Sequence, residues 1–304
     1  MSCKAIFDLL SDLTPYDVPG CGKMRVGSPN DGGYVMLDRL RPSQAVFSYG
    51  LSWNIAFEAD LARRGHTVFM FDHTIEALPE QHPGLNWFKE GLAAVSAPEQ
   101  RLFALPDHLA RLAPDAWGMI LKLDIEGAEW DALAALPAAV LDRFEQIVVE
   151  LHDFRRAGEP GWRNRAKTVL HKLAQAFTVH HVHGNNHAPL AVVGNMFPVA
   201  DVIEVSYIRR DLEPRAGLSA LLPSYLDAPN DPARPEMPLW FFPFVPMGDL
   251  GGRGPWPRRR GARLRGLRVR WRRGGVAAVR KARHKNSREI DAVPRYRCLH
   301  CGVF

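Results

Sequence analysis

The stretch 121–133, LKLDIEGAEWDAL, places carboxylates directly after an apolar segment. Burying an ionised group costs free energy unless the group is paired or faces a site. Gly127 allows the chain to turn, and acidic residues after it suit the first turns of a helix. A well-capped helix alone does not explain why Asp124 and Glu126 occur together. We therefore predict that both border a reacting centre.

A second polar pair ends the segment 145–154, EQIVVELHDF. With the two-residue period of a strand, Glu150 and His152 share one face. A neutral histidine beside carboxylates can act as a general base near neutral pH, and a purely structural histidine is the alternative. The sequence thus predicts His152 as a third catalytic residue, together with Asp124 and Glu126.

Alternating strands and helices must position these residues. Residues 1–210 alternate short β-branched or aromatic runs with longer amphipathic stretches, which predicts βαβ units around a mostly parallel sheet. Strands are expected at 45–50, 67–72, 86–94, 118–125, 145–154, 178–184 and 201–210. Helices are expected at 53–65, 105–113, 126–136 and 161–177. No helix separates the last two strands, so we expect them to close the sheet as an antiparallel pair.

The turn after the first of these strands has the features of a ligand-binding loop. Ligands of open α/β sheets bind at the carboxyl ends of the strands, and Gly50 permits close approach of a ligand to the backbone there. Asp72 ends the next strand 22 residues later, the spacing at which an acid meets ribose hydroxyls. An ordinary turn, with Asp72 as a capping residue, is the alternative. The three-glycine dinucleotide fingerprint is absent, which disfavours a nicotinamide-dependent oxidoreductase.

In order and content, these motifs resemble the FkbM-type and related S-adenosylmethionine-dependent methyltransferases. The resemblance covers about residues 15–210 and rests on RVGSPNDGGYVMLD (25–38), FSYGLSWNIAFEADLARRGHTVFMFD (47–72), ILKLDIEGAEWDAL (120–133), IVVELHDF (147–154), HVHGNN (181–186) and DVIEVSYIRR (201–210). It implies a Rossmann-like class I methyltransferase fold, which is α/β with a seven-stranded, mostly parallel sheet, a terminal antiparallel strand and flanking helices. The chain departs from the family pattern at Gly50-Leu51-Ser52-Trp53, where several glycines are usual.

The resemblance also implies a cofactor, a reaction and a set of site residues. The expected reaction is in-line methyl transfer to a hydroxyl of a small molecule or saccharide. The residues expected to bind S-adenosyl-L-methionine are Tyr49, Gly50, Ser52, Asp72 and Asp124. The residues expected to contact the substrate are Asn30, Asp31, Tyr34, Asn185 and Asn186. A simple hairpin turn is the alternative for the loop 29–33.

Two clusters of metal-ligand residue types do not have the spacing of a closed metal site. Along a strand, His181 and His183 share one face and His180 faces the other, with His187 beyond the strand. The single Cys298-Leu299-His300-Cys301 motif offers at most three ligands. The sequence therefore predicts no metal site.

The formal charge of +6 and the pI near 9.3 are unevenly distributed along the chain. From residue 251 onward, 17 basic residues accompany two acidic ones, a net +15, and residues 1–250 carry −9. We expect a methyltransferase domain over 1–210, a Pro-rich wrapping segment or linker over 211–257, and a basic, disordered tail over 258–304. The tail suggests an alternative function, a non-catalytic Rossmann-like module that binds nucleic acid or an anionic surface.

The composition sets the broad class of protein. A chain of 304 residues that is 46% hydrophobic and 24% charged is typical of a soluble globular protein, not of a disordered or collagen-like one. Four cysteines are too few for a disulfide framework, so a reducing compartment is expected. The first residues lack a secretory signal pattern, and no apolar run approaches the roughly 20 residues of a membrane span. We therefore expect a cytoplasmic enzyme.

Overall fold

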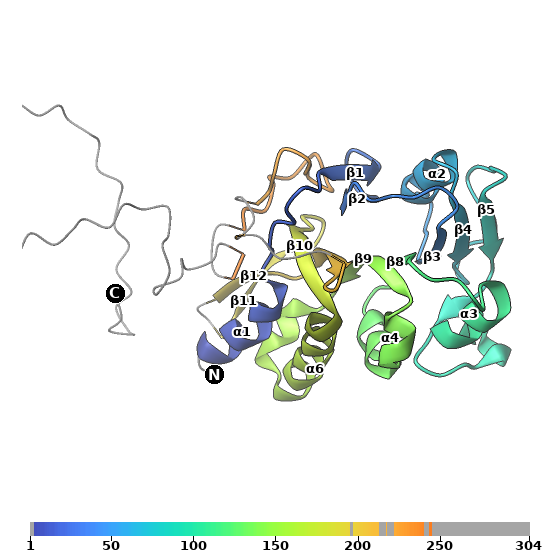
Figure 1. Ribbon diagram of the computed structural model, residues 1–304. Coiled ribbons are helices and arrows are strands. Elements are labelled where there is room, and N and C mark those ends of the chain that lie inside the picture. The colour runs from blue at the N-terminus through green and yellow to red at the C-terminus, as the bar shows by residue number, and fades with distance from the viewer. Residues whose placement is uncertain (1–2, 195–196, 213–216, 218–221, 240–242, 245–304) are drawn as a thin grey trace, which may run out of the picture. The chain divides into compact units, whose positions relative to one another are not determined.

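The computed structural model describes residues 3–194, 197–212, 217, 222–239 and 243–244. A seven-stranded sheet lies at its centre (Figure 1). Its strands, in chain order, are β3 (Ala45–Tyr49), β4 (Thr67–Phe71), β5 (Leu85–Phe88), β8 (Met119–Leu123), β9 (Phe144–Leu151), β10 (Phe177–Gly184) and β13 (Ile203–Arg209). Their order across the sheet is β10-β13-β9-β8-β3-β4-β5. All of them run parallel except β13, which is antiparallel to both of its neighbours.

This topology confirms the predicted fold class, a Rossmann-like α/β fold with a seven-stranded, mostly parallel sheet. The last strand of the described residues is the antiparallel one, as expected, but it lies between β9 and β10 and not at the sheet edge. Strand order reverses between β3 and β8, where the chain leaves the first half of the sheet and returns to start the second. Ligands of such sheets bind at this reversal, beyond the carboxyl ends of the strands.

Helices cover both faces of the sheet. Figure 1 shows α1, α3, α4 and α6 on one side, and α2 with the β1–β2 hairpin on the other. The bounds of these elements are α1 (Cys3–Leu10), α2 (Ala56–Arg63), α3 (Leu105–Leu112), α4 (Glu129–Ala135), α5 (Ala138–Leu141), α6 (Pro160–Ala176), β1 (Lys23–Gly27) and β2 (Gly33–Leu37). Three short 3-10 helices, Ser11–Leu13, Pro98–Gln100 and Phe154–Gly158, lie within the described residues.

Side chains alternate along the strands, so each strand contributes residues to the cores on both faces of the sheet. In β3, Phe47 and Tyr49 belong to the core beneath α1, α3, α4 and α6, whereas Val46 belongs to the core beneath α2. In β8, Leu121 and Ile120 divide in the same way. This alternation has a consequence for the polar residues of the strands. A polar residue two positions after Val46 or Ile120 must face α2.

The structure divides the predicted strand at 86–94 between two short strands. The structure ends β5 at Phe88 and forms β6 (Gly91–Leu92), which pairs in parallel with β7 (Leu102–Phe103) outside the main sheet. The amide of Gly91 donates to the carbonyl of Arg101 at 2.8 Å. The prediction of one strand was therefore wrong, because the segment after Phe88 leaves the sheet to pair with a different partner. A further hairpin, β11 (Leu190–Val193) and β12 (Phe197–Ala200), precedes β13.

Residues 222–239, which we call the strap, return to the carboxyl end of β10 and the adjacent amino end of β13, and they form part of the predicted wrapping segment 211–257. Asn186 binds the middle of the strap, because its amide oxygen accepts a hydrogen bond from the backbone of Asp231 at 2.7 Å. Asn30 binds it nearby, donating from its side chain to the carbonyl of Pro229 at 2.8 Å. The strap is thus tied to both the first hairpin and the last strands.

The predicted tail 258–304 lies outside the described residues, and so does its Cys298–Cys301 motif. The alternative of a nucleic-acid or anionic-surface module, which depends on that tail, stays a prediction. Within the described ranges, no helix has the length and apolar character required to cross a bilayer.

Candidate functional site

The turn at Gly50 brings the ends of β3 and β8 into contact. Gly50 has φ +79°, and a Cβ atom built on it would lie 1.6 Å from the carbonyl oxygen of Asp124. The amide of Asp124 donates to the carbonyl of Tyr49 at 3.0 Å, and the ammonium of Lys122 donates to the carbonyl of Gly50. Only glycine fits this position, because the backbone is left-handed and a second backbone segment occupies the side-chain direction.

Asp72 ties the same turn to the end of β4. One carboxylate oxygen accepts from the amides of Leu51 at 2.9 Å and Ser52 at 3.2 Å. The other accepts from the amide and the hydroxyl of Thr74, at 2.8 and 2.6 Å. Burial raises the pKa of Asp72, but these hydrogen bonds outweigh it and hold the pKa below its usual value. The ribose-binding role of Asp72 stays a prediction, and a sugar hydroxyl would share a carboxylate that already accepts four hydrogen bonds.

A cavity of about 530 Å³ opens at the carboxyl ends of β3, β4 and β8. Its apolar walls come from the sheet end, the loop after β4 and the β6–β7 pair, and carboxylates lie at its mouth. The lining residues are Gly50, Leu51, Ser52, Phe71, Asp72, His73, Thr74, Ile75, Gly91, Leu92, Leu102, Asp124, Ile125, Glu126 and Ala128. Four of the five residues predicted to bind the cofactor therefore lie around one cavity.

Tyr49 is the exception among them. Its side chain is fully buried in the core under α3, stacked on Phe71, and its hydroxyl is 2.9 Å from Nδ1 of His108. Alternation along β3 turns it away from the cavity, so only its backbone reaches the sheet end.

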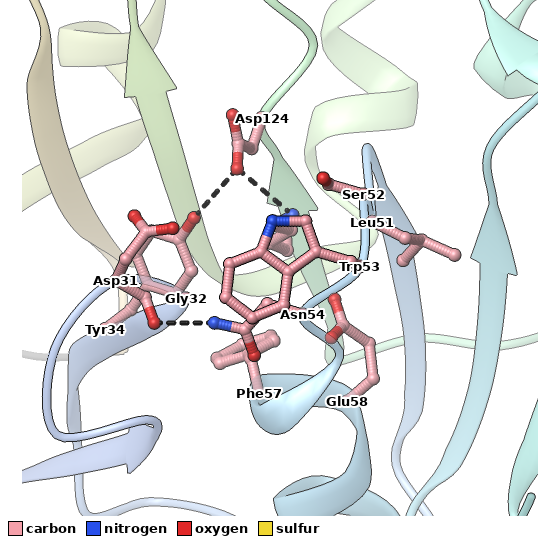
Figure 2. Close-up of a pocket in the computed structure, with 11 residues that line it drawn as sticks. Asp31, Gly32, Tyr34, Leu51, Ser52, Trp53, Asn54, Phe57, Glu58 and Asp124 are labelled. Atoms are coloured by element: carbon pink, nitrogen blue, oxygen red, sulfur yellow. Dashed lines mark hydrogen bonds and ion pairs between the residues drawn. The ribbon is translucent and has the colours of Figure 1, made fainter. Parts of the chain in front are cut away.

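A smaller cavity, of about 50 Å³, adjoins the larger one and shares Leu51, Ser52 and Asp124 with it. Figure 2 shows it between the loop after β1 and the start of α2. The hydroxyl of Tyr34 donates to Asp124 at 3.3 Å. Trp53 lines this cavity with 78% of its surface exposed. The hairpin expected as an alternative for the loop 29–33 does form, between β1 and β2, and Asp31 and Tyr34 also line the cavity.

A buried lysine and a buried glutamate, Lys122 and Glu58, line the smaller cavity. Lys122 is 4% exposed, and its ammonium lies 3.5 Å from the carboxylate of Asp124. Glu58 of α2, which is 1% exposed, accepts a hydrogen bond from the hydroxyl of Ser48 on the same face of the sheet. Burial raises the pKa of Glu58, and the charge of Lys122 opposes that rise. Burial lowers the pKa of Lys122, but Asp124, Glu58 and Glu150 together raise it above its usual value, so the side chain stays cationic.

His152 is fixed by a carboxylate behind it. Glu129, which is fully buried at the start of α4, accepts from the backbone amide of His152 at 2.8 Å and lies 3.2 Å from its Nδ1. The opposite nitrogen, Nε2, lies 3.5 Å from Glu126 and 3.8 Å from Glu150. Burial lowers the pKa of His152, but Glu129, Asp124 and Glu126 raise it above its usual value. The three predicted catalytic residues therefore lie within one group.

Glu126 differs from the other two in its exposure. It adopts φ +55°, and 87% of its side chain is exposed at the edge of the larger cavity. A carboxylate in this position can exchange protons with solvent, whereas His152 is 9% exposed.

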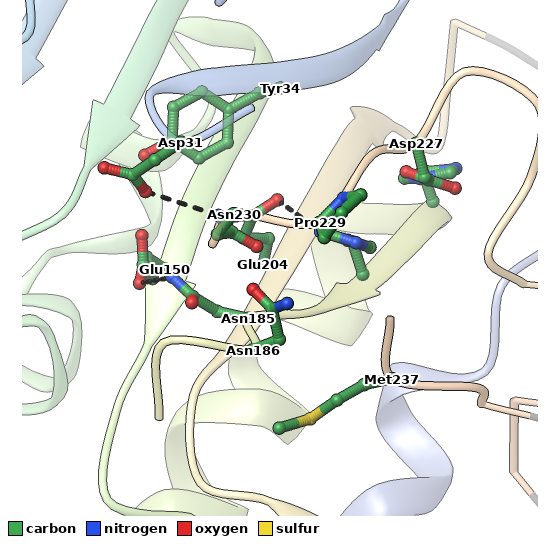
Figure 3. Close-up of polar contacts among 12 residues, drawn as sticks. Asp31, Tyr34, Glu150, Asn185, Asn186, Glu204, Asp227, Pro229, Asn230 and Met237 are labelled. Carbon is green, nitrogen blue, oxygen red and sulfur yellow. Dashed lines mark hydrogen bonds and ion pairs between the residues drawn. The ribbon is translucent and has the colours of Figure 1, made fainter. Parts of the chain in front are cut away.

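Next to this group is a cluster of carboxylates and amides, which we call the wall (Figure 3). It consists of Asp31, Glu150, Asn185, Glu204 and Asn230. Glu150 accepts from the amide of Asn185 at 2.7 Å, and Glu204 accepts from the amide of Asn230 at 2.6 Å. Asn230 also lies 3.3 Å from Asp31. Burial, then the charges of Asp124, Glu204 and Asp31, raise the pKa of Glu150 well above its usual value. This wall therefore carries more negative than positive charge.

The amides predicted to contact the substrate have other partners. Asn30 and Asn186 bind the strap, and Asn185 orients Glu150. Each is occupied by a contact within the chain, and the buried amides of Asn185 and Asn186 require such a contact. Their role toward a substrate stays a prediction, and the structure gives them a role in building the wall.

The histidines of β10 also have partners in the chain. His181 lies 2.7 Å from Asp227 of the strap, and His183 lies 3.1 Å from both Glu204 and Glu236. His180 is fully buried and lies at a register shift of β10, where the regular alternation of side chains is interrupted. The prediction that His180 faces away from His181 and His183 stays a prediction.

The His183 contacts predict a specific pH dependence. Burial lowers the pKa of His183, but Glu204 and Glu236 raise it to about 10. Because the folded pKa lies above the unfolded value of about 6.5, the stabilisation is complete below about pH 6.5 and is lost as the pH rises toward about 10. We expect His183→Gln to remove this alkaline loss, measured by urea denaturation across that range. In His181→Gln, a control on the same strand face, the alkaline loss should persist. An equal loss in wild type and His183→Gln would contradict the assignment.

Some members of the site were not predicted as site residues. Glu58 and Glu204 lie inside the quoted segments 47–72 and 201–210, and Asn230 lies in the strap, but their spacing along the chain carries no signal of convergence. Lys122 was noticeable in the sequence as a cation within an apolar strand, but the sequence did not indicate its role. Trp53, next to the predicted Ser52, had the signal of an aromatic residue on a ligand-binding turn.

Comparison with known proteins finds limited similarity. The sequence matches no family model and no curated protein. Among solved structures, the chain is similar to the fibrillarin/Nop5p complex, with 12% identity over 56% of this chain and 74% of that chain, at a TM-score of 0.35. It is also similar to a proposed methyltransferase of an antibiotic biosynthesis pathway from Anabaena variabilis ATCC 29413 (15% identity, 47% of this chain, 58% of that chain, TM-score 0.27).

A third similar structure is a proposed methyltransferase from Thermoplasma acidophilum, with 14% identity over 56% of this chain and 69% of that chain, at a TM-score of 0.30. The chain thus spans less than two thirds of the Anabaena protein. At such TM-scores, none of these similarities bears on what the chain binds.

Proposed function

We propose that this chain is an S-adenosylmethionine-dependent methyltransferase that methylates a hydroxyl of a small molecule or saccharide. The observation that supports it is the pair of adjoining cavities at the strand-order reversal, which share Asp124. The larger would receive the cofactor, and the smaller, of about 50 Å³, would receive only the reacting hydroxyl end of the acceptor. Methyl transfer needs this arrangement, because donor and acceptor must meet along one line.

The larger cavity has suitable chemistry for this cofactor. Its volume of about 530 Å³ lies within the range of roughly 300–1,000 Å³ found for ligand sites. Phe71, Ile75 and Leu92 offer apolar walls to a flat base. Asp124 and Glu126 place negative charge where a sulfonium cation would lie. The residues present therefore fit the cofactor, with the backbone at Gly50 as the point of closest approach.

The chain's own residues would align and deprotonate the acceptor. The bound cofactor supplies an electrophilic methyl group, and holding two reactants in line is worth up to roughly 7–11 kcal/mol. Asp124 faces both cavities and can accept a hydrogen bond from the acceptor hydroxyl. His152 and Glu126 lie beside each other and can take its proton. Because His152 is buried and Glu126 is exposed, water is better excluded from a proton transfer to His152 than from one to Glu126.

Calorimetry on the full chain tests the proposed function. We expect S-adenosylmethionine and S-adenosylhomocysteine each to bind at one site per chain, with NAD failing to compete. Absence of binding by both sulfur compounds would reject the proposal, and binding of NAD in their place would indicate an oxidoreductase. Incubation with labelled S-adenosylmethionine and fractionated metabolites would then identify the acceptor by its label.

Trp53 should affect the acceptor and not the cofactor. Because it lines only the smaller cavity and is largely exposed, Trp53→Ala should raise the acceptor KM by about tenfold, the equivalent of roughly 1.4 kcal/mol of lost contact. The Kd for S-adenosylmethionine should not change. Trp117→Ala is the matched control, since Trp117 is 66% exposed and lines neither cavity. A change confined to cofactor affinity would show that the roles of the cavities are reversed.

A further inference from the structure

Adjacent strand ends bring three metal-ligand residue types together. β8 and β9 pair in parallel with Leu123 opposite Val149, so the next residues, Asp124 and Glu150, emerge side by side. His152 follows two positions later. One ligand atom from each of Asp124, Glu150 and His152 lies within 4.8 Å of the others. An ion with ligand distances of about 2.1 Å holds its ligand atoms up to about 4.2 Å apart, so small side-chain rotations bring all three onto one ion.

The orientation of His152 points to a cation. With Nδ1 held by the buried carboxylate of Glu129, the other ring nitrogen, Nε2, faces Glu126 and Glu150. Within the described part of the chain, Nε2 has no hydrogen-bond partner, and His152 is 9% exposed. Two carboxylates that face Nε2 favour a positive charge between them, which a proton on Nε2 or a bound cation can supply. A histidine held from behind by a carboxylate is also the usual arrangement around a protein-bound metal.

The neighbouring cations compensate only part of the candidate set. Lys122 donates to the carbonyl of Gly50 and pairs with Asp124. His183 is shared by Glu204 and a glutamate of the strap. Neither cation forms an ion pair with Glu150 among the described residues, so a divalent ion would balance the carboxylate charge that Lys122 leaves.

We propose that Asp124, Glu150 and His152 form a binding site for a divalent transition-metal ion. Two carboxylates and one imidazole favour Mn²⁺, Fe²⁺, Co²⁺ or Zn²⁺ over Mg²⁺ and Ca²⁺, which prefer oxygen ligands alone. Asp124, one of the three ligands, lines both cavities, so the ion would meet the acceptor hydroxyl.

The role of the ion rests on the proposed function. An alcohol bound to a divalent cation loses its proton more easily, and Glu126 is the exposed carboxylate that can accept it and pass it to solvent. The alkoxide lone pair then forms the new bond to the methyl carbon. The carbon–sulfur bond breaks with its electrons on sulfur, and the products are a methyl ether, S-adenosylhomocysteine and one proton. In this scheme His152 is a ligand and Glu126 the base.

Metal binding is measured directly on the full chain without cofactor or acceptor. After treatment with a chelator and its removal, Mn²⁺ is titrated and free Mn²⁺ is followed by electron paramagnetic resonance. We expect one ion per chain, about 10–100-fold weaker binding in Glu129→Gln, and at least as large a loss in His152→Ala. Bound Co²⁺ should give a visible spectrum that His152→Ala changes. His171→Ala is the control, because His171 has a 65% exposed side chain far from these strand ends.

Two results would overturn the site: no Mn²⁺ binding by the wild-type chain, or binding that is unchanged in both His152→Ala and Glu150→Gln. Glu150→Gln preserves shape, so it decides the matter if His152→Ala fails to fold, as judged by circular dichroism. Calorimetry with S-adenosylmethionine in the presence of chelator separates this inference from the proposed function. Cofactor binding without Mn²⁺ binding rejects only the metal, and Mn²⁺ binding without cofactor binding rejects only the methyltransferase.

Discussion

Gly50→Ala should destabilise the end of the sheet and weaken the proposed binding of S-adenosylmethionine. A left-handed backbone costs a residue with a Cβ atom roughly 1–2 kcal/mol, and the overlap with the carbonyl of Asp124 adds about 1–3 kcal/mol as the strand ends move apart. Because β3 and β8 meet at this point, their separation also displaces Asp124 from both cavities. We expect a lower free energy of unfolding in guanidinium and at least roughly tenfold weaker binding of S-adenosylmethionine.

Gly65→Ala separates the two causes. Gly65 has φ +90°, close to that of Gly50, but a Cβ atom there would have no neighbour within 4 Å. This control therefore carries the conformational cost without the overlap, and it should leave cofactor affinity unchanged. If both variants lost the same stability and both bound cofactor normally, close packing of the strand ends would not be what selects glycine at position 50.

Lys122→Met should be the most destabilising of the side-chain changes considered. Removing one partner of a buried ion pair costs roughly 3–5 kcal/mol, because the remaining charge is left without compensation. In this chain the remaining charges are Glu58, which is 1% exposed, and Asp124. The loss should be largest above the pKa of Glu58 and shrink as the pH falls through it, since a neutral carboxyl is easier to bury. Urea denaturation at several pH values measures both effects.

The double variant Lys122→Met/Glu58→Gln should regain much of the stability lost in the single one, because it removes the buried charge that was left behind. Lys89→Met is the surface control, since Lys89 pairs with the 88% exposed Glu76 and its loss should change stability little. A double variant no more stable than Lys122→Met would mean that Lys122 acts through its hydrogen bond to Gly50.

The fold was predictable because its determinants are local in sequence. β-branched and aromatic runs marked the buried strands, and the segment without a helix before 201–210 indicated the antiparallel strand. The segment 86–94 was misread because periodicity cannot say which partner a strand pairs with. Its second half pairs with β7, a choice made by tertiary contacts.

The site was predictable only where motifs follow strands. Asp124 and His152 end neighbouring strands of the parallel sheet, so they had to lie close together. Glu58, on a helix, and Asn230, in the strap, reach the same place through packing. No short-range pattern records such convergence. Contacts within the chain also occupy two residues that the sequence places at the site, because the side chains of Asn30 and Asn186 bind the strap.

The position of β13 determines when the sheet can be completed during synthesis of the chain. It is the last strand of the described residues to emerge from the ribosome, yet it lies between β9 and β10, which are made earlier. Until it arrives, the buried strand β9 has an unpaired edge and the buried strand β10 has no partner in the sheet, and unpaired strand edges promote aggregation. A nascent chain halted before residue 203 should therefore require chaperone protection, and completion of the sheet marks the point at which the domain becomes safe to release.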